Sequence, residues 1–281
     1  MKSIKRLFRL YLPFSKASVK VELAYKAQIV MWIFIAFVET FFVIFLYGAI
    51  YRNSADGINS VINGFTFHDI ILYTVTSFFF SYIMGGGDTS YDIATDIREG
   101  TIANTLTKPV SYRLRHLFSG FGSFAFSFVV IVVPFLTIIY GVFAGLGWLN
   151  VEICTFLLNV VFFLIFSILA SVISNGISYF VGMMVFYTDH LFGLNMAKNA
   201  IQSFLGGQMV PLAYMGMMGV VFSYTPFAFL NSAPVLVLMG KVEISQILIY
   251  IFVALAWIIV IEVANKVIFN HALKKLTVQG G

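Results

Sequence analysis

The stretch AYKAQIVMWIFIAFVETFFVIFLYGAI, residues 24–50, is apolar over almost its whole length. As a helix, a run of about 20 apolar residues is long enough to cross a hydrocarbon core roughly 30 Å thick. The strands of a membrane β-barrel would instead alternate polar and apolar residues along the chain. The stretch therefore predicts a transmembrane helix.

The rest of the chain has the same character. Of its 281 residues 60% are hydrophobic and only 10% are charged, whereas about a quarter of the residues of a soluble domain are charged. Further apolar runs predict spans at about 67–87, 116–146 and 152–174, one within 176–206, and one at about 243–268. We therefore expect one all-α membrane domain over residues 1–281, with six transmembrane helices. The boundary between the fourth and fifth helices is open: it lies near Asn175 or near Asp189.

Lysine and arginine indicate the orientation. Seven of the 17 lie in residues 1–26, four in 90–115 and three in 266–281. Because cytoplasmic loops of membrane proteins carry an excess of these residues, all three regions are expected on the cytoplasmic side of a plasma membrane. Both termini then share one side, which an even number of spans such as six satisfies.

The basic N-terminus could be mistaken for a signal peptide. Pro13, Lys16 and Lys20 interrupt the sequence, and no apolar core with a small-residue cleavage site follows. We expect residues 1–23 to be retained as an amphipathic helix that lies in the membrane interface beside anionic lipid. A solvated basic tail is the alternative.

The one long polar passage is SYDIATDIREGTIANTLTKPVSYRLR, residues 90–115, between the second and third expected spans. Its apolar residues recur at nearly helical spacing: Ile93, Ile97, Ile102 and Leu106. The pattern predicts a short amphipathic helix that is interrupted at Gly100 and ends before Pro109. A mere connector could be a few residues long, so the passage indicates docking on a partner. A helix resting on lipid headgroups is equally compatible with the composition.

Two blocks of sequence resemble one family. IREGTIANTLTKPVS, residues 97–111, resembles the cytoplasmic signature of ABC-2 type permeases, the membrane subunits of a class of ATP-driven exporters. FLGGQMVPL, residues 204–212, followed by Pro226-Phe227 and Pro234, is similar to the family's stretch before the last span. Gly206 stands where the family usually has Ser. This departure concerns the assignment of a branch within the family and of a substrate more than the assignment of the family itself.

The resemblance implies that residues 91–106 are a coupling helix seated in a cleft of a cytoplasmic ATPase subunit. Arg98 and Glu99 are the expected contacts across that interface, with Ile97 and Ile102 as buried anchors. The full set of expected coupling residues is Tyr91, Ile93, Ile97, Arg98, Glu99, Gly100, Ile102 and Leu106.

The resemblance also implies the partners. Two ATPase subunits would bind ATP and magnesium, and a second permease, identical or related, would complete the pathway. The substrate would be a drug, peptide, lipid or polysaccharide. The sequence itself contains no phosphate-binding loop, because the glycine run at residues 85–87 lacks the Lys that such a loop requires. No histidine pair has metal-ligand spacing. We therefore expect a chain without catalytic residues, metal, cofactor or nucleic-acid partner.

By the same resemblance, residues 206–240 would form a re-entrant helical hairpin at the outer face. Its distinguishing residues are Gly206, Gly207, Pro211, Pro226 and Phe227. Non-helical backbone at membrane depth is tolerated only where it is packed in protein or lines a cavity, so this segment is expected to be enclosed.

Two groups of polar residues are candidates for a pathway. Glu39 lies near the middle of the first span, where a charge costs a few kcal/mol unless it is neutralised, paired or hydrated. It is either a substrate or proton site or a structural carboxyl. The second group is Asp189, His190, Asn195, Lys198, Asn199 and Gln202, which either lines a cavity or marks a cytoplasmic helix end. If these groups couple an ion gradient, the chain is a secondary transporter or channel instead. Glu262 and Lys266, one turn apart, are expected to pair with each other.

Overall fold

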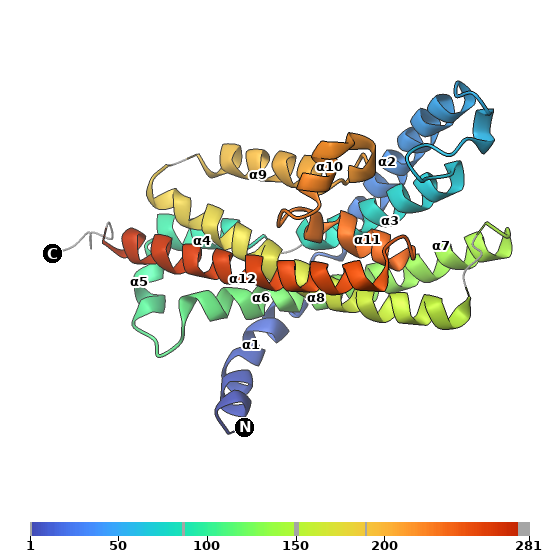
Figure 1. The fold of residues 1–281 in the computed structure, drawn as a ribbon. Coiled ribbons are helices and arrows are strands. Elements are labelled where there is room, and N and C mark those ends of the chain that lie inside the picture. Colours follow the sequence, from blue (N-terminus) through green and yellow to red (C-terminus); the bar gives the residue numbers. More distant parts are fainter. Residues whose placement is uncertain (1, 86–87, 149–151, 189, 275–281) are drawn as a thin grey trace.

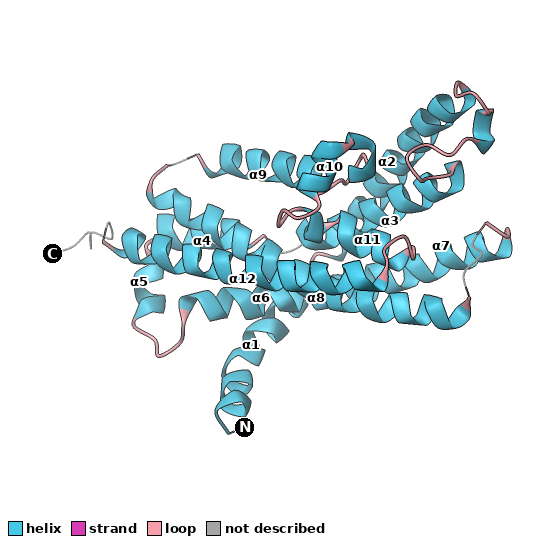
Figure 2. Cartoon of the chain, viewed as in Figure 1, coloured by secondary structure: helices cyan, strands magenta, loops and turns pink. Residues whose placement is uncertain are grey.

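The computed structural model describes residues 2–85, 88–148, 152–188 and 190–274, without the side chains of residues 2–6, 26, 83 and 106. Helices joined by loops make up this part of the chain (Figure 2), and the described residues contain no β-strand. The expectation of an all-α fold is thus confirmed for the described residues.

The helices follow one another with short connections (Figure 1). They are α1 (Lys2–Ala24), α2 (Lys26–Arg52), α3 (Phe67–Gly85), α4 (Thr89–Arg98), α5 (Thr101–Leu106), α6 (Tyr112–Ser127), α7 (Val133–Gly145), α8 (Ile153–Met183), α9 (Leu191–Leu205), α10 (Met217–Phe222), α11 (Ser232–Leu238) and α12 (Ile244–Leu273). Single turns of 3₁₀-helix lie at Gly57–Asn59, Met184–Phe186, Leu212–Met215 and Ala228–Leu230. A π-helical turn at Phe128–Val132 joins α6 to α7 just before Pro134, where the missing N–H of proline would break an α-helical ladder.

Four helical stretches within the described residues are long and apolar enough to cross a membrane: Ala27–Arg52, Tyr112–Gly145, Ile153–Phe186 and Ile244–Leu273. The third runs on past Asn175, so the open boundary lies at residues 187–190. Helix α9 has 15 residues and rises only about 22 Å, less than the thickness of the hydrocarbon core. The chain is a multi-pass membrane protein, and the count of six spans stays a prediction.

Helix α8 lies at the centre of the packing and contacts α4, α6, α11 and α12. Its buried side includes aromatic residues such as Phe166, but also many small polar residues, among them Ser167, Ser174 and Ser178. Small residues let helix backbones approach closely where lipid provides no hydrophobic driving force between helices. At Gly182 the approach to α4 is so close that a Cβ atom would lie 3.0 Å from Ile93 Cβ.

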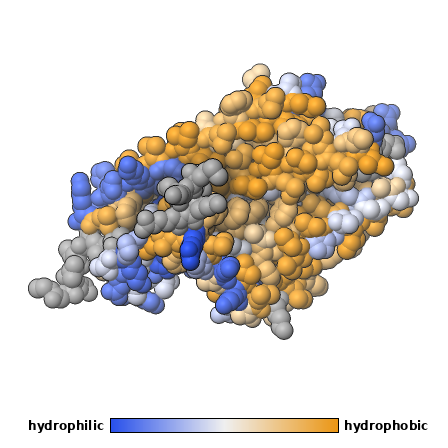
Figure 3. Space-filling model, turned by 90° about the horizontal axis from the view of Figure 1, so that it is seen from below, coloured by the Kyte–Doolittle hydropathy of each residue, from blue (hydrophilic) through white to orange (hydrophobic). Residues whose placement is uncertain are grey.

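The surface is predominantly apolar. Large hydrophobic side chains of α2, such as Phe34, Phe42 and Phe45, are more than half exposed. The space-filling view shows a broad hydrophobic band with hydrophilic residues gathered toward the ends of the molecule, most densely at the end that holds α4 and α5 (Figure 3). Such a surface is suited to contact with lipid or with another hydrophobic protein.

Helix α1 projects from the bundle and is attached through α6 (Figure 1). Ser15 Oγ donates to the carbonyl oxygen of Phe118 at 2.6 Å, and Tyr11 stacks on the ring of Phe118. The backbone N–H of Ser111, directly after the polar passage, donates to Tyr11 Oη at 2.7 Å. The expected helix at residues 1–23 is therefore present, while its place in the membrane interface stays a prediction.

Candidate functional site

The polar passage folds into a helical hairpin, α4–α5. Asp88 caps α4 by accepting a hydrogen bond from Ser90 N at 3.1 Å, as a short acidic side chain does at a helix start. After Arg98 the chain turns at Gly100, whose φ of +70° is a left-handed conformation that side chains other than glycine rarely adopt. Helix α5 then begins at Thr101, so the expected interruption at Gly100 is confirmed.

The apolar face of this hairpin packs into its own chain. Ile93 and Ile102 are fully buried in one cluster with Tyr112, Tyr179 and Met183, and Ile97 packs against its edge. In this structure Ile97 and Ile102 therefore hold the hairpin to the bundle, which differs from their expected role as anchors in a partner. Leu106 ends α5, and its side chain lies outside the described residues.

The opposite face is exposed and polar. Tyr91, Asp92, Thr95, Arg98 and Glu99 are all solvent-accessible. Although the Asp92 side chain is exposed, partial loss of its hydration raises the pKa of Asp92, and the neighbouring Asp96 carboxylate raises this pKa further. This exposed face therefore has mixed charge.

A shallow hollow of about 460 Å³ extends this exposed face toward the start of α9. It is lined by Tyr91, Ala94, Thr95, Arg98, His190, Leu191, Phe192 and Gly193. The structure thus places His190 beside the hairpin. Asp189 lies outside the described residues.

Asp96 joins the two helices of the hairpin to α6. Its carboxylate accepts hydrogen bonds from Thr101 Oγ1 and Tyr112 Oη, each at 3.0 Å, and Arg115 Nη1 lies 3.5 Å away. Arg115 also donates to Thr105 Oγ1. These contacts join α4 and α5 to the start of α6.

A second connection runs from α4 to α9. Lys198 Nζ lies 2.6 Å from Asp88 Oδ2, with 6% of the lysine and 17% of the aspartate side chain exposed. Ser90 and Asn195 bond to each other through their side chains at 2.8 Å. Burial alone would raise the pKa of Asp88, but the Lys198 ammonium and the hydrogen bonds from Ser90 outweigh it and hold this pKa below its usual range.

A third connection reaches α8 and α12. Asn175 Nδ2 donates to Thr89 Oγ1 at 2.8 Å, and Asn175 Oδ1 accepts from Arg113. The Arg113 guanidinium binds both carboxylate oxygens of Glu262 and lies 4.9 Å from the ring centre of Tyr179. The expected pair of Glu262 with Lys266 was wrong: Glu262 binds a residue that is far away in sequence.

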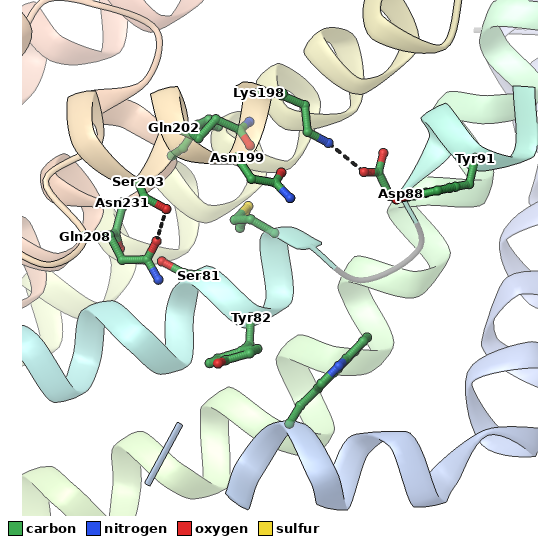
Figure 4. A pocket seen from close by; sticks show the side chains of 13 residues that line it. Ser81, Tyr82, Asp88, Tyr91, Lys198, Asn199, Gln202, Ser203, Gln208 and Asn231 are labelled. Atoms are coloured by element: carbon green, nitrogen blue, oxygen red, sulfur yellow. Dashed lines mark hydrogen bonds and ion pairs between the residues drawn. The ribbon is translucent and has the colours of Figure 1, made fainter. Parts of the chain in front are cut away.

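Beside α4 lies a cavity of about 400 Å³ with a mixed polar and apolar lining, which we call the α9 cavity (Figure 4). Its lining residues come from α2, α3, α4, α9 and the segment after α9: Trp32, Ser81, Tyr82, Met84, Asp88, Tyr91, Lys198, Asn199, Gln202, Ser203, Gln208, Leu230 and Asn231. The structure thus brings the predicted Lys198 and Gln202 together with two residues of the polar hairpin, Asp88 and Tyr91.

Glu39 is not among the residues that line the α9 cavity. Tyr82, which lines it, donates a hydrogen bond to Glu39 Oε2 at 3.1 Å. The half-buried carboxyl therefore lies one hydrogen bond away from the cavity. This partner reduces the cost of placing the carboxyl within an apolar helix.

The segment after α9 is stabilised by hydroxyl groups of the apolar helices. Three successive carbonyl oxygens, of Gly207, Gln208 and Met209, accept hydrogen bonds from Tyr73, Ser77 and Tyr47, respectively. Gly207 has a φ of +70°, which favours glycine. These bonds are what non-helical backbone in apolar surroundings requires.

Close packing continues through the expected re-entrant residues. A Cβ on Gly206 would lie 3.1 Å from the carbonyl oxygen of Phe227, the residue after Pro226, and the Gly206 carbonyl oxygen accepts from Ser232 N at 3.0 Å. Pro211 precedes a single 3₁₀ turn. The segment thus consists of short helices and turns. Residues 228–235 are buried in the bundle, but α10 is exposed, with Met217 87% accessible, so the expectation of an enclosed segment was wrong for most of its first half. Its re-entry into a membrane stays a prediction.

Sequence reasoning missed several lining residues of the α9 cavity: Trp32, Ser81, Tyr82, Asp88, Ser203, Gln208 and Asn231. Only Asp88 carried a local signal, because Asp followed by Thr-Ser after a glycine run is typical of a helix start. Within the described residues no three His, Cys, Asp or Glu side chains are grouped to hold a metal ion.

Comparison with known proteins identifies the family of the chain. A family model described as "ABC-2 family transporter protein" matches residues 37–280. No curated protein and no solved structure matches the chain. The family match covers the polar hairpin, every helix from α3 to α12, and all the lining residues of the α9 cavity except Trp32. The chain therefore belongs to the ABC-2 family of transporter proteins.

Proposed function

We propose that the chain is the permease subunit of an exporter whose ATP hydrolysis takes place on a separate ATPase subunit. The observation that carries the proposal is the double role of α4. One face of α4 is bonded into its own bundle, the other exposes Tyr91, Arg98 and Glu99, and its first residues form part of the wall of the α9 cavity. An element of this kind is suited to convert a push from a partner into a change of the cavity.

In the proposed mechanism, ATP binding draws two ATPase subunits together and displaces α4. Because the Asp88–Lys198 and Ser90–Asn195 contacts join α4 to α9, α9 moves with it. Asn199 and Gln202 lie on the wall that moves, whereas Trp32 belongs to α2, which packs on α3. The cavity then changes shape and passes an amphiphilic or polymeric substrate outward.

The proposed assembly contains two permeases, identical or related, and two ATPase subunits that bind ATP and magnesium. The exposed apolar face of α2 supports a large hydrophobic contact, with a second permease or with lipid. Six spans, cytoplasmic termini and a plasma-membrane location complete the proposal.

The test is purification of the chain with the products of its neighbouring genes, followed by transport and ATPase assays in lipid vesicles. The double variant Arg98→Glu/Glu99→Lys should lose ATP-driven transport and the bound ATPase, while the helical content of the chain is unchanged. Arg52→Glu/Asp56→Lys makes the same exchange of charges at exposed positions at and just after the end of α2, away from the hairpin. It is the matched control and should retain both. Full ATP-driven transport by the Arg98→Glu/Glu99→Lys variant would contradict the proposal.

One observation favours a second candidate function, an ion-gradient-driven secondary transporter or channel: the contact between Glu39 and a residue of the cavity wall. Glu39→Gln keeps the shape of the side chain and removes its charge. In an ATP-driven permease this change should leave transport largely intact, whereas in a proton-coupled transporter it should abolish transport. Measurement of substrate movement under a pH gradient without ATP separates the two functions.

A further inference from the structure

The α9 cavity has a mixed polar and apolar lining and carries no net charge. Its lining contains two charged side chains, Asp88 and Lys198, and these neutralise each other at 2.6 Å (Figure 4). A charged ligand would have to separate this pair or be buried without a partner, and either is unfavourable. The wall therefore favours an uncharged ligand.

Several carboxamide groups of the lining retain unused hydrogen-bonding capacity. Asn231 Oδ1 is fully buried without a hydrogen-bond partner, while Asn231 Nδ2 donates to Ser77. The side chains of Asn199 and Gln202 make no hydrogen bond within the described chain. Gln208 uses its side-chain oxygen to accept from Ser203 at 2.7 Å (Figure 4), which leaves its NH₂ group as a donor. Asn231 Oδ1 is too deeply buried to contact a ligand. The accessible amides of Asn199, Gln202 and Gln208 provide both donors and acceptors, so the cavity favours a ligand that both donates and accepts.

Aromatic side chains provide the other part of the lining. Trp32, Tyr82 and Tyr91 come from α2, α3 and α4, respectively, and complement the amides of α9 and the following segment. An aromatic ring presents an apolar face together with a polar edge or tip. The ligand therefore needs apolar faces as well as groups that donate and accept hydrogen bonds.

We infer that the α9 cavity binds an uncharged, multiply hydroxylated ring, such as the glycosyl group of an amphiphile or a free sugar of one or two rings. Hydroxyl groups donate and accept at the same atom, and the C–H faces of a sugar ring are apolar. The volume of about 400 Å³ is within the range of small-molecule sites. The inference rests on the proposed function, because it names the substrate class of the exporter.

The test uses the full chain in phosphatidylcholine nanodiscs, with Trp148→Phe and Trp257→Phe so that Trp32 is the sole tryptophan. Dodecyl maltoside, kept below its micelle concentration, should cause a saturable change in Trp32 fluorescence. Asn199→Leu/Gln202→Leu should raise the half-saturating concentration at least tenfold, because two hydrogen bonds are lost. Asn104→Leu makes the same kind of change on α5, outside the cavity, and should leave the concentration unchanged.

The comparison ligands decide between the remaining outcomes. A response to free maltose equal to that of dodecyl maltoside supports the site and identifies a free sugar, whereas a response to dodecyl maltoside alone identifies a lipid headgroup. Tighter binding of dodecylphosphocholine, dodecyl sulfate or a neutral capped tripeptide would overturn the inference. So would unchanged affinity in the Asn199→Leu/Gln202→Leu variant when its thermal unfolding matches that of the parent. The binding measurement uses no ATP and no ATPase subunit. Failure of the ATP-driven transport experiment therefore does not change the binding result, and a failure to bind sugar does not contradict the proposal of an ATP-driven permease.

Discussion

The Asp88–Lys198 pair is expected to hold α4 and α9 together, and a double-mutant cycle measures its strength. Asp88→Asn removes the charge but keeps a side chain that caps a helix well, so the loss reports on the ion pair and not on the cap. Lys198→Met removes the ammonium and keeps the length of the side chain. The two residues are 110 positions apart, so their coupling reports tertiary structure alone.

The magnitude follows from the burial of both partners. Removal of one member of a buried pair typically costs about 3–5 kcal/mol, because the other charge is left without a partner. Since 17% of the Asp88 side chain is exposed, we expect about 3 kcal/mol for each single variant. The double variant leaves no unpaired charge and should cost no more than about 2 kcal/mol. The two single effects are therefore expected to be strongly non-additive.

The assay is equilibrium unfolding of the purified chain in detergent, together with ATP-driven transport in vesicles. The reasoning would be refuted if every variant lost less than about 1 kcal/mol of its free energy of unfolding relative to the parent. It would also be refuted if the losses of the two single variants added up to the loss of the double variant. Transport should be reduced in both single variants even at temperatures where they remain folded, because of the two polar contacts that join α4 to α9 only the Ser90–Asn195 contact would remain.

The pH dependence of the pair has a definite sign. The pKa of Asp88 is lower in the folded protein than the value of about 3.9 for a free aspartate. Its contribution to stability is therefore fully present above pH 4 and is lost as the pH falls through the folded pKa. The stability difference between the parent and Asp88→Asn should be constant between pH 5 and pH 8 and should shrink only in more acidic solution. A difference that disappears between pH 6 and 7 would show that another group is titrating.

Further changes test other contacts. Gly182→Ala should lower the free energy of unfolding by about 1–3 kcal/mol, because its Cβ would press on Ile93 and Ser90, whereas Gly193→Ala on α9, with no neighbour within 4 Å, should be neutral or slightly stabilising. Tyr73→Phe should destabilise by about 1–3 kcal/mol in thermal unfolding, since the Gly207 carbonyl oxygen loses its buried donor; an unchanged melting temperature would mean that this carbonyl finds another partner. Glu262→Gln should destabilise by roughly 2 kcal/mol, below the range for fully buried pairs because 37% of the Glu262 side chain is exposed. Lys266→Gln should have almost no effect, and equal effects of these two changes would contradict the assignment of Arg113 as the partner of Glu262.

Much of the fold could be predicted because it depends on local chemistry. Most of the long apolar runs appear as helices near the expected bounds, since the requirement to satisfy the backbone in lipid admits little else. Helix α8, however, extends to Met183, nine residues beyond the expected end, and α9 begins only at Leu191. The hairpin was predictable from the spacing of its apolar residues and from Gly100, which supplies the left-handed turn that the structure shows. Asp189 and the side chain of Leu106, both predicted as functional, lie outside the described residues.

The candidate site was less predictable because its residues converge from distant parts of the chain. The polar residues of α9 were recognised, but their partners Asp88, Ser81 and Tyr82 lie more than 100 positions earlier. Glu262 was assigned to the neighbour that helical spacing suggests, yet it binds Arg113. Spacing determines which side chains share a face, and it contains no information about which helix lies opposite.

The sequence by itself determined that this is a helical membrane protein with a polar hairpin on one side, because hydropathy, turn residues and charge bias act over a few neighbouring residues. Only the tertiary structure decided which face of that hairpin is buried and what its residues contact. Periodicity shows that Ile93 and Ile102 share an apolar face, but burial against α8 or against a partner yields the same pattern. The Asp88–Lys198 pair and the cavity beside it arise from helix packing, which brings together groups that no local signal connects.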